Sequence, residues 1–191
     1  RLSFFRFSFC ETTFPPKATM NSEQSSKKDW PPIPFGEWRD TAAALHLYLQ
    51  IAGKYRLARS PWLNHSWHAT LYVTPRGLTT STIPDGDGSI EVVFDLIYHR
   101  VHGHCASGHS AGFPLQPMSV AQFHSRFVEM IVELGGNPDF HGRPNELPDP
   151  IPFADDAAER PYDADAVTRF HRVLVSVNRV FQDFRTGFLG K

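Results

Sequence analysis

Histidine, tyrosine, threonine and arginine side chains gather in residues 64–80. Alternation in a strand predicted through this segment places His68, Thr70 and Tyr72 on one face. A polar face of this kind suits a small anionic or polar ligand, and histidine exchanges protons near neutral pH. The candidate acid or base is therefore His68, with His65 as the second choice.

The candidate ligand-binding set extends beyond that strand. Arg76 lies in the turn that follows it, and Lys54 lies where a predicted helix meets a predicted strand. The complete set is Lys54, His65, His68, Tyr72, Arg76 and Thr80. These residues could instead form the solvent side of an antiparallel sheet or satisfy nearby loops, and the sequence favours this structural interpretation.

A second pattern, Gly108-His-Ser-Ala-Gly112, matches the G-x-S-x-G turn that carries the nucleophile of α/β-hydrolases. Asp155 and His171 follow Ser110 in the chain order of that triad. The turn requires a helix directly after the serine, and Pro114 opposes one. The sequence therefore favours a flexible hairpin tip over a serine hydrolase.

Three histidines, His102, His104 and His109, flank the same tip and could together bind zinc or copper. No carboxylate stands beside them at metal-ligand spacing, so a solvated hairpin is favoured and we assign no metal site. An arginine series further along is interpreted as a solvated helix face; its members are Arg169, Arg172, Arg179 and Arg185. No nucleotide-binding motif is present, and the residues identify no cofactor.

The composition of the chain limits the classes of partner that we expect it to bind. The 191 residues carry 19 basic and 20 acidic side chains, a formal charge of -1, which argues against a nucleic-acid partner. No apolar run reaches the roughly 18–20 residues that cross a bilayer, so we expect no membrane partner. With only two cysteines the chain needs no disulfide framework, and we expect a cytoplasmic protein.

The periodicity predicts an α+β fold, with a mainly antiparallel sheet of about five strands and three amphipathic helices. The predicted strands cover residues 54–58, 66–74, 78–83, 90–98, 100–105 and 110–115. The predicted helices cover residues 38–53, 119–134 and 164–186. Ser119 and Gln122 form a capping box at the start of the second helix.

Two similar segments suggest a duplicated unit. Pro32-Ile-Pro-Phe35 leads to a helix that ends at Gly53-Lys54, and Pro150-Ile-Pro-Phe153 leads to one that ends at Gly190-Lys191. The last helix would then belong to an incomplete second repeat that has lost its strands, or it would dock on the sheet of the first unit. The expected divisions are a disordered or non-native leader (1–29), a first unit (30–136), an acidic, proline-rich connection (137–162) and the truncated second unit (163–191).

Several motifs in order carry a resemblance to a known family. They are Trp30-Pro-Pro-Ile-Pro, Glu37-Trp-Arg-Asp-Thr41, Leu45-His-Leu-Tyr-Leu-Gln-Ile-Ala-Gly-Lys54, Asn64-His-Ser-Trp-His68, Leu71-Tyr-Val-Thr-Pro-Arg-Gly-Leu-Thr-Thr80, Asp149-Pro-Ile-Pro-Phe153 and Phe188-Leu-Gly-Lys191. Over residues 30–191 the chain resembles an uncharacterised bacterial family known only as a domain of unknown function. The resemblance implies a soluble, cytosolic protein whose relatives continue beyond residue 191, and it supplies no reaction.

We expect a domain that binds a small polar molecule or a protein partner. The alternative is a hydrolase-like enzyme that uses His68 as acid or base. Convergence of His68, Arg76 and Lys54 in one pocket would favour the enzyme, whereas their separation would favour the binding domain.

Overall fold

The structure is a computed structural model that describes residues 30–188. In chain order its elements are α2 (Phe35–Arg59), the 3-10 helix η1 (Asn64–Ala69), β1 (Tyr72–Thr74), β2 (Gly77–Asp85), β3 (Gly88–Asp95), β4 (Arg100–Cys105), β5 (Ser110–Pro114), β6 (Met118–Ser119), α3 (Val120–Glu133), β7 (Glu159–Arg160) and α4 (Ala164–Thr186). The fold is α+β, as predicted. The expected leader (1–29) and the second Gly-Lys pair (190–191) lie outside the described residues.

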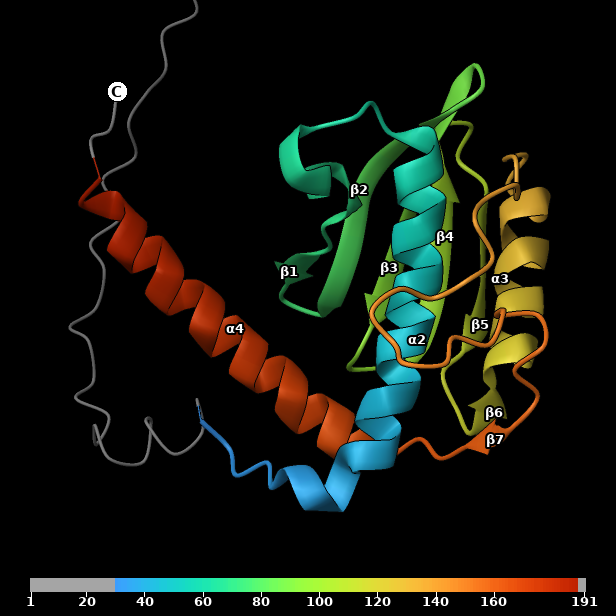
Figure 1. Ribbon diagram of the computed structural model, residues 1–191. Helices are drawn as coiled ribbons and strands as arrows, with labels where there is room; N and C mark the ends of the chain where they lie inside the picture. Colours follow the sequence, from blue (N-terminus) through green and yellow to red (C-terminus); the bar gives the residue numbers. More distant parts are fainter. Residues whose placement is uncertain (1–29, 189–191) are drawn as a thin grey trace, which may run out of the picture.

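A five-stranded antiparallel sheet with the order β1-β2-β3-β4-β5 forms the centre of the molecule (Figure 1). The hairpins between β2 and β5 confirm the strands predicted within residues 78–115, except that β3 ends at Asp95 and residues 96–98 of the predicted strand form a turn. Alternation explains this agreement: Ile90, Val92 and Phe94 point into the core, while the alternate residues Glu91 and Val93 point to the opposite face of the sheet. Helices α2 and α3 cover the apolar face of the sheet (Figure 1).

Helix α2 is longer than predicted, and the strand expected over residues 54–58 is wrong. The helix continues through Gly53 to Arg59 because its buried face continues, with Tyr55 fully buried. Glycine inside a helix costs only about 1 kcal/mol relative to alanine, which packing of this face outweighs. The helix ends where Pro61 restricts the preceding Ser60 to an extended conformation.

The strand predicted over residues 66–74 is also largely wrong, because only β1 forms there. The chain before it folds into η1, in which His65 and Ser66 have left-handed backbone angles (φ 53° and 58°). The ring of His68 accepts a hydrogen bond at Nδ1 from the Leu63 backbone N–H, 3.0 Å away. A local bond from side chain to backbone of this kind competes with strand formation.

Helix α3 begins at the predicted capping box. Ser119 Oγ accepts a hydrogen bond from the Gln122 N–H, and Gln122 Oε1 accepts one from the Ser119 N–H, both at 3.1 Å. The helix joins α2 through a stacked pair of rings, Tyr48 and Phe123, whose centroids are 4.3 Å apart. The Tyr48 hydroxyl donates to the Met118 carbonyl at 2.8 Å, which ties α2 to β6.

Helix α4 packs against the body mainly through its N-terminal half. Asp163 caps it by accepting from the Ala166 N–H at 2.9 Å, and Val167 is buried. Further along, Phe181 and Phe184 are 66% and 84% exposed. This half of the helix projects away from the sheet (Figure 1). The division into a complete and a truncated unit stays a prediction.

None of the helices within residues 30–188 is both long enough and apolar enough to span a lipid bilayer.

Candidate functional site

The residues predicted to form one polar face are separated in the structure. Lys54 lies on α2, His68 is the buried residue of η1, and Arg76 lies in the turn between β1 and β2. The separation follows from the two wrong strands, because a helix and a 3-10 turn place their side chains differently from an alternating strand. The convergence that would favour a hydrolase is therefore not found.

Two of the candidates have structural roles. His68 is only 3% exposed, and its Nδ1 accepts the Leu63 N–H that closes η1. Thr80 is fully buried; its Oγ1 accepts from the Val92 N–H at 2.9 Å and donates to the Ser81 carbonyl at 2.7 Å. These bonds satisfy backbone groups at an irregularity in the pairing of β2 with β3. By contrast, His65 is exposed on η1.

Arg76 is committed to an ion pair. Its Nε donates to Asp95 Oδ2 at 2.9 Å, its Nη2 donates to the same oxygen, and its Cζ lies 4.6 Å from the ring centroid of Tyr98. Burial by itself would raise the pKa of Asp95. Hydrogen bonds from the Tyr98 N–H, Arg76 and the Ile97 N–H outweigh burial and lower the pKa of Asp95 below its ordinary value.

Lys54, in contrast, borders a groove of about 370 Å³ between α2, η1 and the 145–146 loop, which we call the α2–η1 groove. Its walls combine apolar and polar residues. The apolar ones are Leu49, Leu57, Ala69 and Leu71, and the polar ones are His46, Gln50, Lys54, Ser66, Asn145 and Glu146. Lys54 Nζ donates to Asn145 Oδ1 at 2.8 Å. Partial burial lowers the pKa of Lys54 below its ordinary value.

A long-range clamp holds the loop that closes this groove. Gln50 Oε1 accepts from the Asn145 N–H at 2.8 Å, and Gln50 Nε2 donates to the Asn145 carbonyl at 3.1 Å. The same amide lies 3.1 Å from His46 Nε2. Together with Lys54, these contacts fix the polar edge of the groove. Sequence analysis missed Gln50, His46 and Asn145, because only the tertiary structure brings the loop to the helix.

Arg56 is a further residue that the sequence analysis missed. It is 7% exposed, its Cζ lies 5.1 Å from the ring centroid of Tyr72, and its Nε and Nη1 have no hydrogen-bond partner. The signal was present in the chain: continuing the helical stripe of Tyr48 and Ala52 by four residues places Arg56 on the buried face. The predicted helix ended at Gly53, so Arg56 was not placed on its buried face.

The triad suggested by Ser110 does not assemble. His171 is buried, and its Nε2 lies 3.0 Å from the Thr74 carbonyl oxygen. Ser110 opens strand β5 instead of a helix, so the nucleophile turn is absent. Its Oγ lies 2.9 Å from His104 Nδ1 at an exposed position on the hairpin.

The hairpin histidines form a pair. The rings of His102 and His104 stack with centroids 6.2 Å apart. Burial, followed by the nearby charge of Arg100, lowers the pKa of His102 below its ordinary value. Within residues 30–188, no group of three or more His, Cys, Asp or Glu side chains is placed to hold a metal ion.

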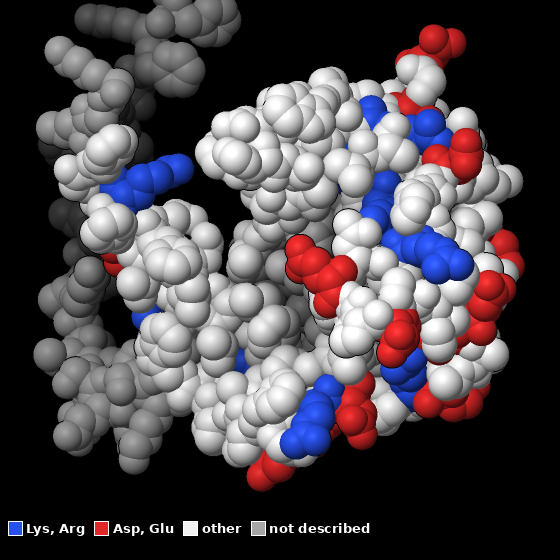
Figure 2. Space-filling model, in the orientation of Figure 1, with Lys and Arg blue, Asp and Glu red and all other residues white. Residues whose placement is uncertain are grey.

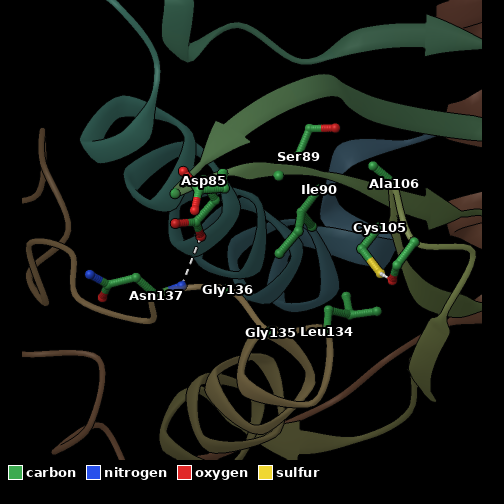
Figure 3. Close-up of a pocket in the computed structure, with 13 residues that line it drawn as sticks. Asp85, Ser89, Ile90, Cys105, Ala106, Leu134, Gly135, Gly136 and Asn137 are labelled. Atoms are coloured by element: carbon green, nitrogen blue, oxygen red, sulfur yellow. Dashed lines mark hydrogen bonds between the residues drawn. The ribbon is translucent and has the colours of Figure 1, made fainter.

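Another hollow, of about 400 Å³, lies between the β2–β3 turn and the end of α3 (Figure 3). Asp85, at its edge, accepts hydrogen bonds from the Tyr55 hydroxyl at 2.7 Å and the Asn137 N–H at 2.8 Å. A Cβ at Gly136 would approach Asp85 Oδ2 to 2.8 Å, so the loop crosses this carboxylate closely. These contacts give Asp85 a structural role at the edge of the hollow.

Comparison with known proteins gives one relationship. Searches of curated proteins and of solved structures found no match. The model of a family of unknown function, DUF5996, matches residues 30–191, the span over which the sequence motifs suggested a resemblance. The chain therefore belongs to the DUF5996 family.

Proposed function

We propose that this protein is a binding domain for a small polar ligand and that the α2–η1 groove holds the ligand. The observation that carries the proposal is the convergence of the Lys54 ammonium and the Gln50–Asn145 amide pair on a groove with leucine walls. Ligand pockets typically combine apolar walls with a few fixed polar groups. The ligand is expected to pair an apolar body with a hydrogen-bond acceptor that reaches Lys54.

Binding is favoured over hydrolysis for a geometric reason. Lys54 borders the groove, whereas the His68 side chain of η1 is buried and Arg76 is paired with Asp95. General acid–base catalysis requires the titrating group within hydrogen-bond reach of the substrate. A hydrolase built on His68 would need the ring to leave the Leu63 N–H that it accepts.

A screen of polar metabolites by thermal shift, followed by calorimetry of the hits, tests the proposal. Lys54→Gln keeps a polar side chain but removes the charge, and binding is expected to weaken at least about tenfold, the effect of ~1.4 kcal/mol. Arg172→Gln, at an exposed position on α4, is the control and should leave the affinity unchanged. Hits that bind Lys54→Gln and the wild type equally would contradict the groove as the site.

A protein partner is the second candidate, and the exposed apolar side chains of α4 favour it. Phe181 and Phe184 lie on one side of a helix that projects from the body (Figure 1). Exposed apolar patches of this kind mark interaction surfaces. The first partner to test is a second copy of the chain: sedimentation should show a concentration-dependent dimer that Phe184→Asp abolishes. A monomer at every concentration would reject self-association.

A further inference from the structure

We propose that Arg56 forms the centre of an oxyanion-binding site between α2 and β1, which takes a small carboxylate or phosphate. The site uses a different side chain from the α2–η1 groove, and it stands whether or not a ligand occupies that groove. Its position follows from α2, which packs against η1 and carries Arg56 against the Tyr72 ring of β1.

The surroundings of the Arg56 guanidinium leave its charge uncompensated. No carboxylate within residues 30–188 forms an ion pair with it. The face of the Tyr72 ring, 5.1 Å from Arg56 Cζ, attracts the cation but offers no acceptor oxygen. Both Nε and Nη1 are buried without a hydrogen-bond partner. Two donors of one cation are therefore available below the protein surface.

Burial without a counter-ion is unusual for this side chain. Removing a charge from water carries a penalty that proteins normally offset with an ion pair, hydrogen bonds or a bound ion. Arginine cannot lose its proton to escape this penalty, as lysine does. Its planar fork of donors matches the paired oxygens of carboxylate and phosphate groups. The chemistry of Arg56 therefore specifies an oxyanion.

The 3-10 helix η1, which packs against α2 and leads into β1, is suited to opening. Trp62, Leu63 and Trp67 in and beside η1 point largely into solvent, so little apolar burial holds η1 to the body. Figure 2 shows the surface at η1, in the upper centre, as uncharged, whereas acidic and basic groups gather to the right of it. The consecutive left-handed residues His65 and Ser66 add backbone strain that opening would release. Movement of η1 gives an anion a path to Arg56.

Titration of the full chain with inorganic phosphate, and separately with acetate, tests the site. Chloride replaces each anion at constant ionic strength in the reference titration. The readout is the Nε–Hε signal of Arg56 in a proton–nitrogen correlation spectrum, assigned by its loss in Arg56→Lys. At least one anion is expected to shift that signal saturably.

The variants make the reading specific. Arg56→Met should weaken anion binding at least tenfold, and the control Arg172→Met should leave it unchanged. Saturation by phosphate alone, by acetate alone or by both supports the proposal and identifies the class of oxyanion. No saturable shift with either salt overturns it, as does binding that survives in Arg56→Met. Because the wild-type signal is read directly, the test holds even where Arg56→Met fails to fold, and Lys54→Gln should leave it unaltered.

Discussion

Two arginines of this protein lie against tyrosine rings at opposite ends of the short strand β1. Arg76 contacts Tyr98 at 4.6 Å and Arg56 contacts Tyr72 at 5.1 Å. The side chain of Arg76 is 57% exposed and still has the Asp95 carboxylate as partner. Arg56 is buried and has none within the described part of the chain. The arginine with less need of a partner has one.

This difference separates a structural ion pair from a binding group. Asp95 joins Arg76 to the loop after β3 by also accepting the Ile97 and Tyr98 N–H groups, at 3.0 and 2.8 Å. Every charge there is used to hold the fold. The two buried nitrogens of Arg56, Nε and Nη1, donate no hydrogen bond to the protein. The proposal assigns these donors to a ligand.

The largest expected effect comes from the carboxylate of the paired site. Asp95→Ala should lower the free energy of unfolding by about 2–3 kcal/mol, because the Ile97 and Tyr98 N–H groups and Arg76 each lose an acceptor. Urea denaturation measures this, with the exposed Asp87→Ala in the β2–β3 turn as control. Equal free energies of unfolding for Asp95→Ala and Asp87→Ala would contradict the structural role of Asp95.

The two arginines should respond to methionine with opposite signs. Replacing an unpaired buried charge with an apolar side chain should raise the free energy of unfolding by about 1–2 kcal/mol in anion-free buffer for Arg56→Met. Arg76→Met should lower it by roughly 1 kcal/mol, since Asp95 then loses its cation. Denaturation in chloride and in phosphate buffer checks both values, and phosphate should reduce the advantage of Arg56→Met. A loss of stability in both variants would contradict the expected difference between Arg56 and Arg76.

A smaller effect is expected from the rings. Tyr72→Leu and Tyr98→Leu each remove a cation–π contact while keeping an apolar side chain. The loss should be larger at Tyr72, about 1–2 kcal/mol against roughly 0.5, because the desolvated Arg56 depends on its ring more strongly. Thermal unfolding of the two variants side by side measures the difference. The reverse order would mean that solvent reaches Arg56 freely.

The smallest expected effect is the loss of stability at acidic pH that follows from protonation of Asp95. The folded-state pKa of Asp95 is lower than its ordinary value of 3.8, so the ionised carboxylate stabilises the fold fully above that pH. The contribution is lost as the pH falls from about 4 through the lower folded-state pKa. Wild type and Asp95→Asn should therefore converge in stability at the acid end of this range. The expected effect is small because solvent screens the exposed Arg76.

The sequence predicted the elements that local chemistry defines. The strands from β2 to β5 alternate and are joined by compact turns, and Ser119 with Gln122 marks the start of α3, so neighbouring residues contain the signal. Gly53 misled the prediction because packing of α2 outweighs its weak helix propensity. The turn at η1 depends on the bond between His68 and Leu63, which the alternation of apolar residues does not reveal.

The candidate site was predicted less well because its parts meet only through tertiary contacts. Lys54 was identified, but its partner Asn145 is 91 positions away along the chain. Arg56 was missed through the helix boundary, and His68 was assigned a solvent-facing role that burial excludes. One-dimensional spacing reports which residues share an element, whereas a groove needs knowledge of which elements meet.

The two outer strands of the sheet carry a consequence for how molecules of this protein meet. At one margin β1 spans only three residues, and at the other β5 ends in Pro114, which has no amide hydrogen to donate. Both margins are poor templates for cross-β growth or for a donated strand from another chain. Two copies of the chain are therefore expected to associate through side-chain contacts and not by pairing the edge strands of their sheets.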